Sequence, residues 1–148
     1  MKRTTAILAA VIGLTLATLG TARADTAVGA VFGYPGNVGL SMRFDRKPID
    51  VAWSDDFIHG TADMWLKLTP MKNGDGKMSW YYGPGIDAGI PLNDDHDFFL
   101  AGRLPIGLQY MASPKLEFFG QLAPGIQILD EVDFYWAGSA GVRFVLGK

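Results

Sequence analysis

From residue 25 onward, apolar and polar residues alternate with a period of two, and short clusters of Gly, Pro, Asp and Asn interrupt the alternation. Such alternation is typical of β-strands with one apolar face, and such clusters are typical of turns. Because the connections are short, consecutive strands should pair antiparallel. The pattern predicts an all-β protein, an eight-stranded antiparallel up-and-down β-barrel (a meander). The predicted strands are Thr26–Gly33, Val38–Phe44, Ile49–Trp53, Phe57–Leu68, Met78–Ile90, Phe98–Tyr110, Leu116–Ile128 and Phe134–Leu146.

The predicted strands have one face of large apolar residues and one face of small, polar and charged residues. In Leu116–Ile128, for example, Phe118 and Leu122 oppose Glu117 and Gln121. A soluble barrel would bury the apolar face, whereas a membrane barrel would turn it to lipid. We favour the membrane barrel, because the polar faces are rich in Gly and Ala and because aromatic residues gather near strand ends, as in interfacial girdles. The predicted lipid-facing aromatic girdle is Trp80, Tyr82, Phe98, Tyr110, Phe118, Phe134, Trp136 and Phe144.

If the polar faces point inward, four basic and four acidic side chains lie inside the barrel. An eight-stranded barrel is just wide enough to be filled by side chains, and unpaired charges there would be costly. We therefore predict a balanced, structural charge network that closes the lumen, and no pore. The predicted network is Arg43, Lys67, Arg103, Arg143, Asp50, Asp63, Asp87 and Glu117.

Three prolines, Pro84, Pro105 and Pro124, fall inside predicted strands, where each removes a hydrogen-bond donor from the sheet. Antiparallel pairing would place all three near one level of the barrel. We interpret them as a belt of bulges or bends that lets a small barrel curve. The alternative is that these strands are each two shorter ones.

Residues 1–24 have the features of a secretory signal. A basic pair precedes the apolar stretch 4–20, and an Ala-Arg-Ala sequence follows at the positions that a signal peptidase recognises. We predict cleavage before Asp25, export across the inner membrane and a single mature barrel domain of residues 25–148. A membrane anchor is the alternative, although the stretch is slightly short for a span.

Composition excludes several classes of protein. The chain has no Cys, which excludes a disulfide scaffold and a thiolate metal site. Hydrophobic residues make up 49% of the chain, too many for a disordered protein. The formal net charge is −2 and no basic cluster occurs, so we expect no nucleic-acid partner.

The predicted connections carry different charges at the two ends of the barrel. One rim holds only acidic charges, namely Asp55, Asp56, Asp94, Asp95, Asp97, Asp130, Glu131 and Asp133. The other rim is mainly basic, with Arg46, Lys47, Lys72, Lys77 and Lys115 against Asp45 and Asp75. With both termini in the periplasm, the acidic rim would face outward and could recruit a divalent cation that bridges to lipid phosphates. Ordinary solvated loops are the alternative.

Metal-binding and cofactor motifs are weak or absent. Asp94, Asp95, His96 and Asp97 are weak candidates for metal ligands, but the spacing of an EF-hand loop is missing, so a polar turn is the default. Phosphate loops, dinucleotide fingerprints and metal-ligand spacings do not occur. We therefore predict no metal and no cofactor.

Catalysis has little support in the sequence. A lipid-modifying enzyme of the outer membrane could use His96 or His59 with Ser54 or Ser79 as nucleophile. No nucleophile-elbow or similar motif surrounds either serine. We therefore predict no catalytic residue and no enzymatic activity.

The last predicted strand, with Ser139, Gly141, Phe144 and Leu146, resembles the C-terminal signal by which the outer-membrane assembly machinery recognises barrels. It departs from that signal in the two residues that follow, Gly147 and Lys148, because such proteins usually end on the aromatic residue. More broadly, the chain resembles small secreted barrels of Gram-negative bacteria of uncharacterised function, which are likened to the transmembrane domains of OmpA and OmpX. The matching segments are Gly33-Tyr34-Pro35-Gly36, Trp80-Tyr81-Tyr82-Gly83-x-Gly85, Arg103-x-Pro105-x-Gly107-Leu108-x-Tyr110, Leu122-Ala123-Pro124, Asp133-Phe134 and Gly141-Val142-Arg143-Phe144. The resemblance implies an eight-stranded barrel in or at the outer membrane and no catalytic residue.

The sequence thus predicts a small bacterial outer-membrane barrel with a structural or adhesive surface role, in contact with outer-membrane lipid. One alternative is a soluble periplasmic barrel that binds a lipid-like ligand, and a third hypothesis is the lipid-modifying enzyme. Burial separates the first two, because Arg103, Glu117 and Arg143 should lie inside in the membrane barrel and outside in the soluble one. The enzyme would need a His within hydrogen-bond reach of a Ser near one rim.

Overall fold

The computed structural model describes residues 25–72, 77–129 and 131–147, and the predicted signal segment, residues 1–24, lies outside them. No helix among the described residues is long and apolar enough to cross a membrane. The described residues form eleven strands: β1 (Thr26–Tyr34), β2 (Val38–Phe44), β3 (Lys47–Trp53), β4 (Phe57–Asp63), β5 (Lys67–Pro70), β6 (Met78–Tyr82), β7 (Gly85–Pro91), β8 (Phe99–Arg103), β9 (Ile106–Ser113), β10 (Leu116–Gln127) and β11 (Asp133–Val145).

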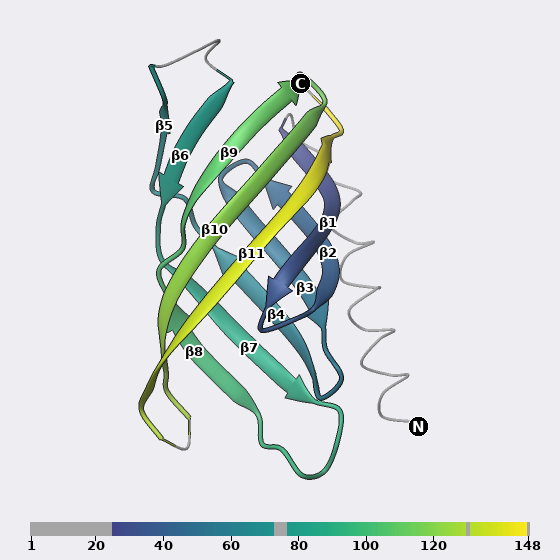
Figure 1. The fold of residues 1–148 in the computed structure, drawn as a ribbon, viewed down its shortest axis with the longest axis vertical. Coiled ribbons are helices and arrows are strands. Elements are labelled where there is room, and N and C mark those ends of the chain that lie inside the picture. The colour runs from purple at the N-terminus through teal and green to yellow at the C-terminus, as the bar shows by residue number, and fades with distance from the viewer. Residues whose placement is uncertain (1–24, 73–76, 130, 148) are drawn as a thin grey trace.

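The strands pair antiparallel in a single sheet, and the sheet closes into a ring (Figure 1). From β10 the order around the ring is β11, β1, β2, β3, β4, β7 and β8, and β8 pairs back onto the second half of β10. Eight strands therefore enclose one interior. The remaining strands β9, β6 and β5 extend the sheet from the first half of β10.

The ring has two different ends. Asp25 N donates a hydrogen bond to Gly147 O (3.1 Å), so the two ends of the described domain meet at one end of the ring, here named the terminal end. The β2–β3, β5–β6 and β9–β10 hairpins turn at the terminal end (Figure 1). The connections β1–β2, β3–β4, β7–β8 and β10–β11 lie at the opposite end, here named the far end (Figure 1).

The prolines interrupt the predicted strands more strongly than a bend would. The predicted strands Met78–Ile90 and Phe98–Tyr110 are each divided in two, at Pro84 and Pro105 respectively, and the alternative of shorter strands is correct there. The predicted strand Phe57–Leu68, which contains no proline, is divided as well, into β4 and β5. Pro124 remains inside β10. All three prolines lie at one level, because their carbonyls accept bonds from the adjacent strands: Met64 N to Pro84 O, Gly83 N to Pro105 O, and Leu104 N to Pro124 O. A proline has no N–H, so each strand pair continues here through the carbonyl alone.

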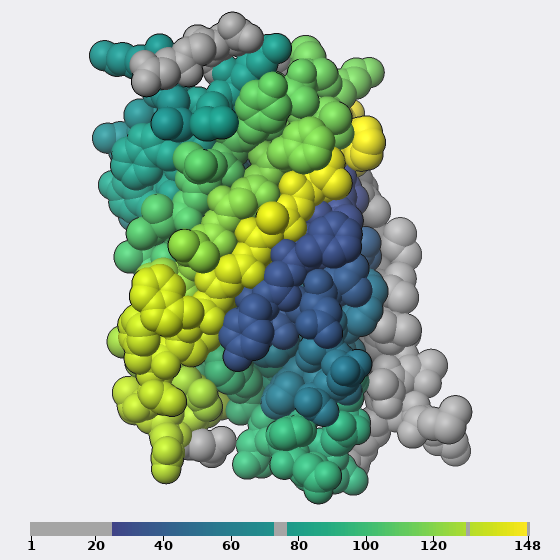
Figure 2. Space-filling model, viewed as in Figure 1, coloured from purple at the N-terminus to yellow at the C-terminus, as the bar shows by residue number. Residues whose placement is uncertain are grey.

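Burial is inverted relative to an ordinary soluble sheet. Among the charged residues, Glu117 and Asp87 are completely buried inside the ring, while Phe144 on the outer surface is 59% exposed. The space-filling view shows β11 and β1 running side by side across one face, with their side chains in close contact (Figure 2). The strand alternation therefore turns polar residues inward and large apolar residues outward.

Candidate functional site: the interior charge network

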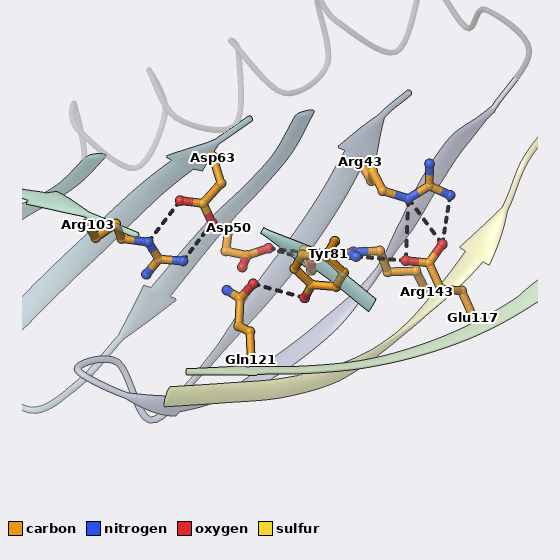
Figure 3. A network of polar contacts seen from close by, with 9 residues as sticks. Arg43, Asp50, Asp63, Tyr81, Arg103, Glu117, Gln121 and Arg143 are labelled. Carbon is orange, nitrogen blue, oxygen red and sulfur yellow. Dashed lines mark hydrogen bonds and ion pairs between the residues drawn. The ribbon is translucent and has the colours of Figure 1, made fainter. Parts of the chain in front are cut away.

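Seven of the eight predicted network residues are buried inside the ring, and several of them are drawn in Figure 3. Each comes from a different strand of the ring, and β1 is the one strand of the ring that contributes no charge. These residues are Arg43 (β2), Asp50 (β3), Asp63 (β4), Asp87 (β7), Arg103 (β8), Glu117 (β10) and Arg143 (β11).

Lys67 is the exception, and its predicted place in the network is wrong: the side chain is exposed. The cause is a bulge, since Leu66 N donates to Tyr82 O (3.0 Å) while Lys67 is the cross-strand partner of the same Tyr82. An extra residue in a strand reverses the alternation beyond it. Trp65 lies before the bulge and keeps the inward parity of Asp63, whereas Lys67 lies beyond it and is on the outer surface.

Glu117 holds two arginines together near the terminal end. Its carboxylate accepts bonds from Arg43 Nη2 (2.7 Å) and Nε (3.1 Å), and from Arg143 Nη1 (2.8 Å). The Arg143 guanidinium also lies 3.7 Å from the centroid of the Phe119 ring, a cation–π contact. At the rim, Arg43 Nη2 contacts Asp25 Oδ1 (3.2 Å). Charge-assisted bonds of this kind are the strong ones in a buried setting.

The network continues across β1 because β1 has a glycine at the crossing point. Gly29 pairs with Arg143 on one side and with Ser41 on the other. A Cβ at Gly29 would lie 2.6 Å from Arg143 Cα, too close for any other residue without a shift. Arg143 Nε donates to Ser41 Oγ (2.7 Å), and Ser41 Oγ donates to Asp50 Oδ1 (2.5 Å). One connected group therefore spans β10, β11, β2 and β3.

A second ion pair, on the other side of the ring, also forms across a strand that has a glycine between the two partners. Arg103 binds Asp63 with two bonds, Nε to Oδ1 (2.8 Å) and Nη2 to Oδ2 (2.6 Å). Their strands are separated by β7, where Gly85 pairs with both residues. A Cβ at Gly85 would lie 1.8 Å from Asp63 Oδ1. The glycine thus leaves the space in which the ion pair forms.

Asp87 is the one described buried carboxylate of the network with no arginine partner. His59 Nδ1 lies 3.2 Å from its Oδ1, and the Tyr135 hydroxyl donates to its Oδ2 (3.2 Å). The His59 ring is further enclosed by Phe57 and Phe99, with centroids 5.5 and 5.7 Å away. The Asp87 carboxylate is therefore held by an imidazole and a phenol hydroxyl rather than by a guanidinium.

Neutralising Asp87 is accordingly expected to be tolerated. Asp87→Asn keeps the shape and the hydrogen-bonding capacity and leaves no arginine unpaired, so the free energy of unfolding should fall by about 1 kcal/mol or less. The measurement is urea unfolding followed by tryptophan fluorescence, with the exposed Asp94→Asn as control. A loss of several kcal/mol would show that the negative charge of Asp87 itself is required.

Aromatic and amide side chains fill the interior between the ion pairs. The rings of Trp65 and Tyr81 stack at 4.0 Å, and both are buried. The Tyr81 hydroxyl donates to Gln121 Oε1 (3.0 Å), which links β6 to β10 (Figure 3). Near the far end, a cavity beside His59 and Ser139 has a volume of about 30 Å³. The side chains thus occupy most of the cross-section.

The other predicted residues lie outside the network. Seven of the eight predicted girdle aromatics are exposed and Tyr82 is half-buried: Trp80, Tyr82, Phe98, Tyr110, Phe118, Phe134, Trp136 and Phe144. Ser139, Gly141 and Phe144 of the predicted assembly signal lie in β11, which is paired on both sides, and Leu146 follows that strand.

The weak metal and catalytic candidates do not assemble into a site. Asp94, Asp95, His96 and Asp97 are exposed, and His96 Nε2 lies 3.9 Å from Asp56 Oδ1. No group of three or more potential ligands occurs in the part of the chain that the structure describes. Ser54 Oγ bonds to its own turn at Phe57, and His59 contacts Asp87 rather than a serine.

Several interior residues were not predicted as members of the network. Ser41, Tyr81 and Tyr135 bond to it directly or lie within it. The usable signal was strand parity, because Ser41 shares the inward face of β2 with Arg43, and Tyr135 shares that of β11 with Arg143. Trp65 could also be found in this way, since it shares the inward parity of Asp63 within the predicted strand Phe57–Leu68.

Comparison with known proteins returned no matching family model, no matching curated protein and no matching solved structure.

Proposed function

We propose that the protein is a small outer-membrane β-barrel of the eight-stranded up-and-down type, with a structural or adhesive role at the bacterial surface. Its lumen is filled by the charge network, so the barrel acts neither as a pore nor as an enzyme. Outer-membrane lipid surrounds it, and the barrel assembly machinery of that membrane inserts it.

The inverted burial carries this proposal. Arg103, Glu117 and Arg143 are at most 8% exposed inside the ring, whereas apolar side chains cover its outer surface. A continuous apolar exterior is unfavourable in water and favourable in lipid. The ring also pairs the backbone groups of its strands with one another, as a membrane span requires. The soluble alternative needs the opposite burial and therefore loses its support.

The lipid-modifying enzyme has no comparable support. Its minimal requirement is a histidine bonded to a serine near one rim, and the described contacts pair His59 with Asp87 and His96 with Asp56 instead. The small interior cavity also argues against an aqueous channel. A structural or adhesive role uses the stable frame itself and needs no reacting group.

The decisive experiment locates the expressed protein and then tests its outer surface. We expect recovery in the outer-membrane fraction and a gel band whose mobility changes on heating; recovery as soluble periplasmic protein would contradict the proposal. Leu122, which is 63% exposed on β10, provides the surface test. Leu122→Lys should cost about 2–4 kcal/mol of unfolding free energy in vesicles if the residue faces lipid near the bilayer centre.

Val132 is the matched control, because it is 81% exposed in the far-end loop. In water both lysine substitutions would be nearly neutral. A cost for Leu122→Lys but not for Val132→Lys therefore separates a lipid-facing strand from a merely exposed one.

A further inference from the structure

The β5–β6 hairpin is a structural feature that the charge network does not explain. It extends the sheet from β9 beyond the proline level at the terminal end (Figure 1), and one of its side chains, Tyr81, packs in the interior. Its outward surface is apolar, with Leu66 57% exposed and Met71 and Met78 each 38% exposed. The rings of Trp80 and Tyr82 stack on this surface at a centroid distance of 5.6 Å.

Lysines border this apolar surface. Lys67 lies directly opposite Tyr82 in the β5–β6 pairing and is exposed because of the bulge at Leu66. Lys72 and Lys77 are exposed in the connection between the two strands. Trp and Tyr rings beside lysines are the usual composition of a surface that sits at the boundary between acyl chains and headgroups.

The charge of the whole terminal end agrees with that of the hairpin. Its other described basic residues, Arg46, Lys47 and Lys115, are all exposed, and its described acidic residues are Asp25, which pairs with Arg43, and Asp45. Asp75, which the sequence also assigns to this end, lies outside the described residues. The described far-end loops show the opposite pattern, with only acidic charges. These are Asp55, Asp56, Asp94, Asp95, Asp97, Glu131 and Asp133.

We propose that the β5–β6 hairpin and the basic terminal end bind the headgroups of anionic phospholipids in the leaflet on that side of the membrane. The proposal rests on the proposed function, because it requires the ring to span a bilayer. Charge complementarity selects the lipid: a phosphate-bearing headgroup with a net negative charge pairs with the lysines, while its acyl chains cover Leu66 and the rings of Trp80 and Tyr82. A zwitterionic headgroup satisfies only the second contact.

The test compares two lipids in vesicles of constant composition. The protein is refolded into vesicles of equal parts phosphatidylcholine and phosphatidylglycerol, in which only one lipid carries brominated chains that quench tryptophan. One variant keeps Trp80 and another keeps Trp136, each with the buried Trp65 as a constant background. Trp136 is the internal control, since it is 58% exposed near the acidic far end.

We expect Trp80 to be quenched more by brominated phosphatidylglycerol than by brominated phosphatidylcholine. The association constant for phosphatidylglycerol should be about five or more times that for phosphatidylcholine, because each lysine near an anionic surface contributes about a five-fold preference. Trp136 should show a ratio near or below one. Neutralising Lys67→Gln with Lys72→Gln should reduce the Trp80 ratio toward one, as should high salt. Neutralising Asp94→Asn with Asp95→Asn at the far end should leave it unchanged.

The outcomes separate the two proposals. Equal quenching of Trp80 by both lipids would overturn the anionic-lipid site and leave the membrane barrel intact. Quenching of Trp136 but not of Trp80 would place the hairpin in water, where an acidic protein could bind it, and would also overturn the site. Absence of quenching at both tryptophans would contradict membrane insertion itself.

Discussion

Replacing Glu117 by Gln is expected to lower the free energy of unfolding by about 3–5 kcal/mol, because it removes the negative charge from between two buried arginines. Arg43 and Arg143 both bond to this carboxylate, and neither side chain is more than 4% exposed. Arg143 keeps contacts with Ser41 and Asp50, and Arg43 keeps Asp25 at the rim. None of these contacts replaces the shared carboxylate.

The loss is measured by urea unfolding in detergent micelles, together with the temperature at which the gel band changes mobility. Glu131→Gln at the exposed far end is the matched control and should change the unfolding free energy by less than about 0.5 kcal/mol. Restoring the balance with Arg43→Met in the Glu117→Gln background should recover part of the stability, since one uncompensated charge is then removed. Full stability of Glu117→Gln alone would show that the arginines are neutralised by water or ions.

Gly85→Ala is expected to disrupt the second ion pair although no charge is changed. The new Cβ would lie 1.8 Å from Asp63 Oδ1, so Asp63 must move away from Arg103 or the backbone of β7 must shift. Either response weakens a buried bidentate pair, and we expect a loss of about 3 kcal/mol or more, from overpacking and charge separation together.

Gly102 is the control for this substitution. It is the cross-strand neighbour of Ile86, next to Gly85, yet a Cβ at Gly102 would meet nothing within 4 Å. Gly102→Ala should therefore be neutral or slightly stabilising, because Ala loses less backbone entropy than Gly in a strand. Equal effects of the two substitutions would indicate a general cost of changing these strands and would contradict a specific role for the space at Gly85.

The two predictions test two different requirements of the interior charge network. Glu117 supplies charge, whereas Gly29 and Gly85 supply room for side chains to meet across an intervening strand. If both predictions are confirmed, the interior acts as the stable frame that a structural or adhesive surface protein needs.

Much of the architecture could be predicted from the sequence because strand alternation is a local property. A period of two located β1, β2, β3, β10 and β11 within a few residues, but it joined β4 to β5, β6 to β7 and β8 to β9. It also separated inward positions such as Glu117 from outward ones such as Phe118. Pro84 and Pro105 likewise marked points at which the predicted strands are interrupted, because each lacks a backbone donor. These inferences need no knowledge of which strands touch.

Tertiary structure decided everything that depends on the register between distant segments. Arg43 and Glu117 are 74 positions apart, so no local pattern could pair them, and the glycine crossings appear only once three strands are aligned. The bulge at Leu66 moved Lys67 to the outer surface, because one extra residue reverses every later position of the strand. The sequence by itself therefore determined which positions of each strand point inward and which point outward. Only the closed ring determined which of them meet, since side-chain contacts depend on pairing geometry that alternation does not contain.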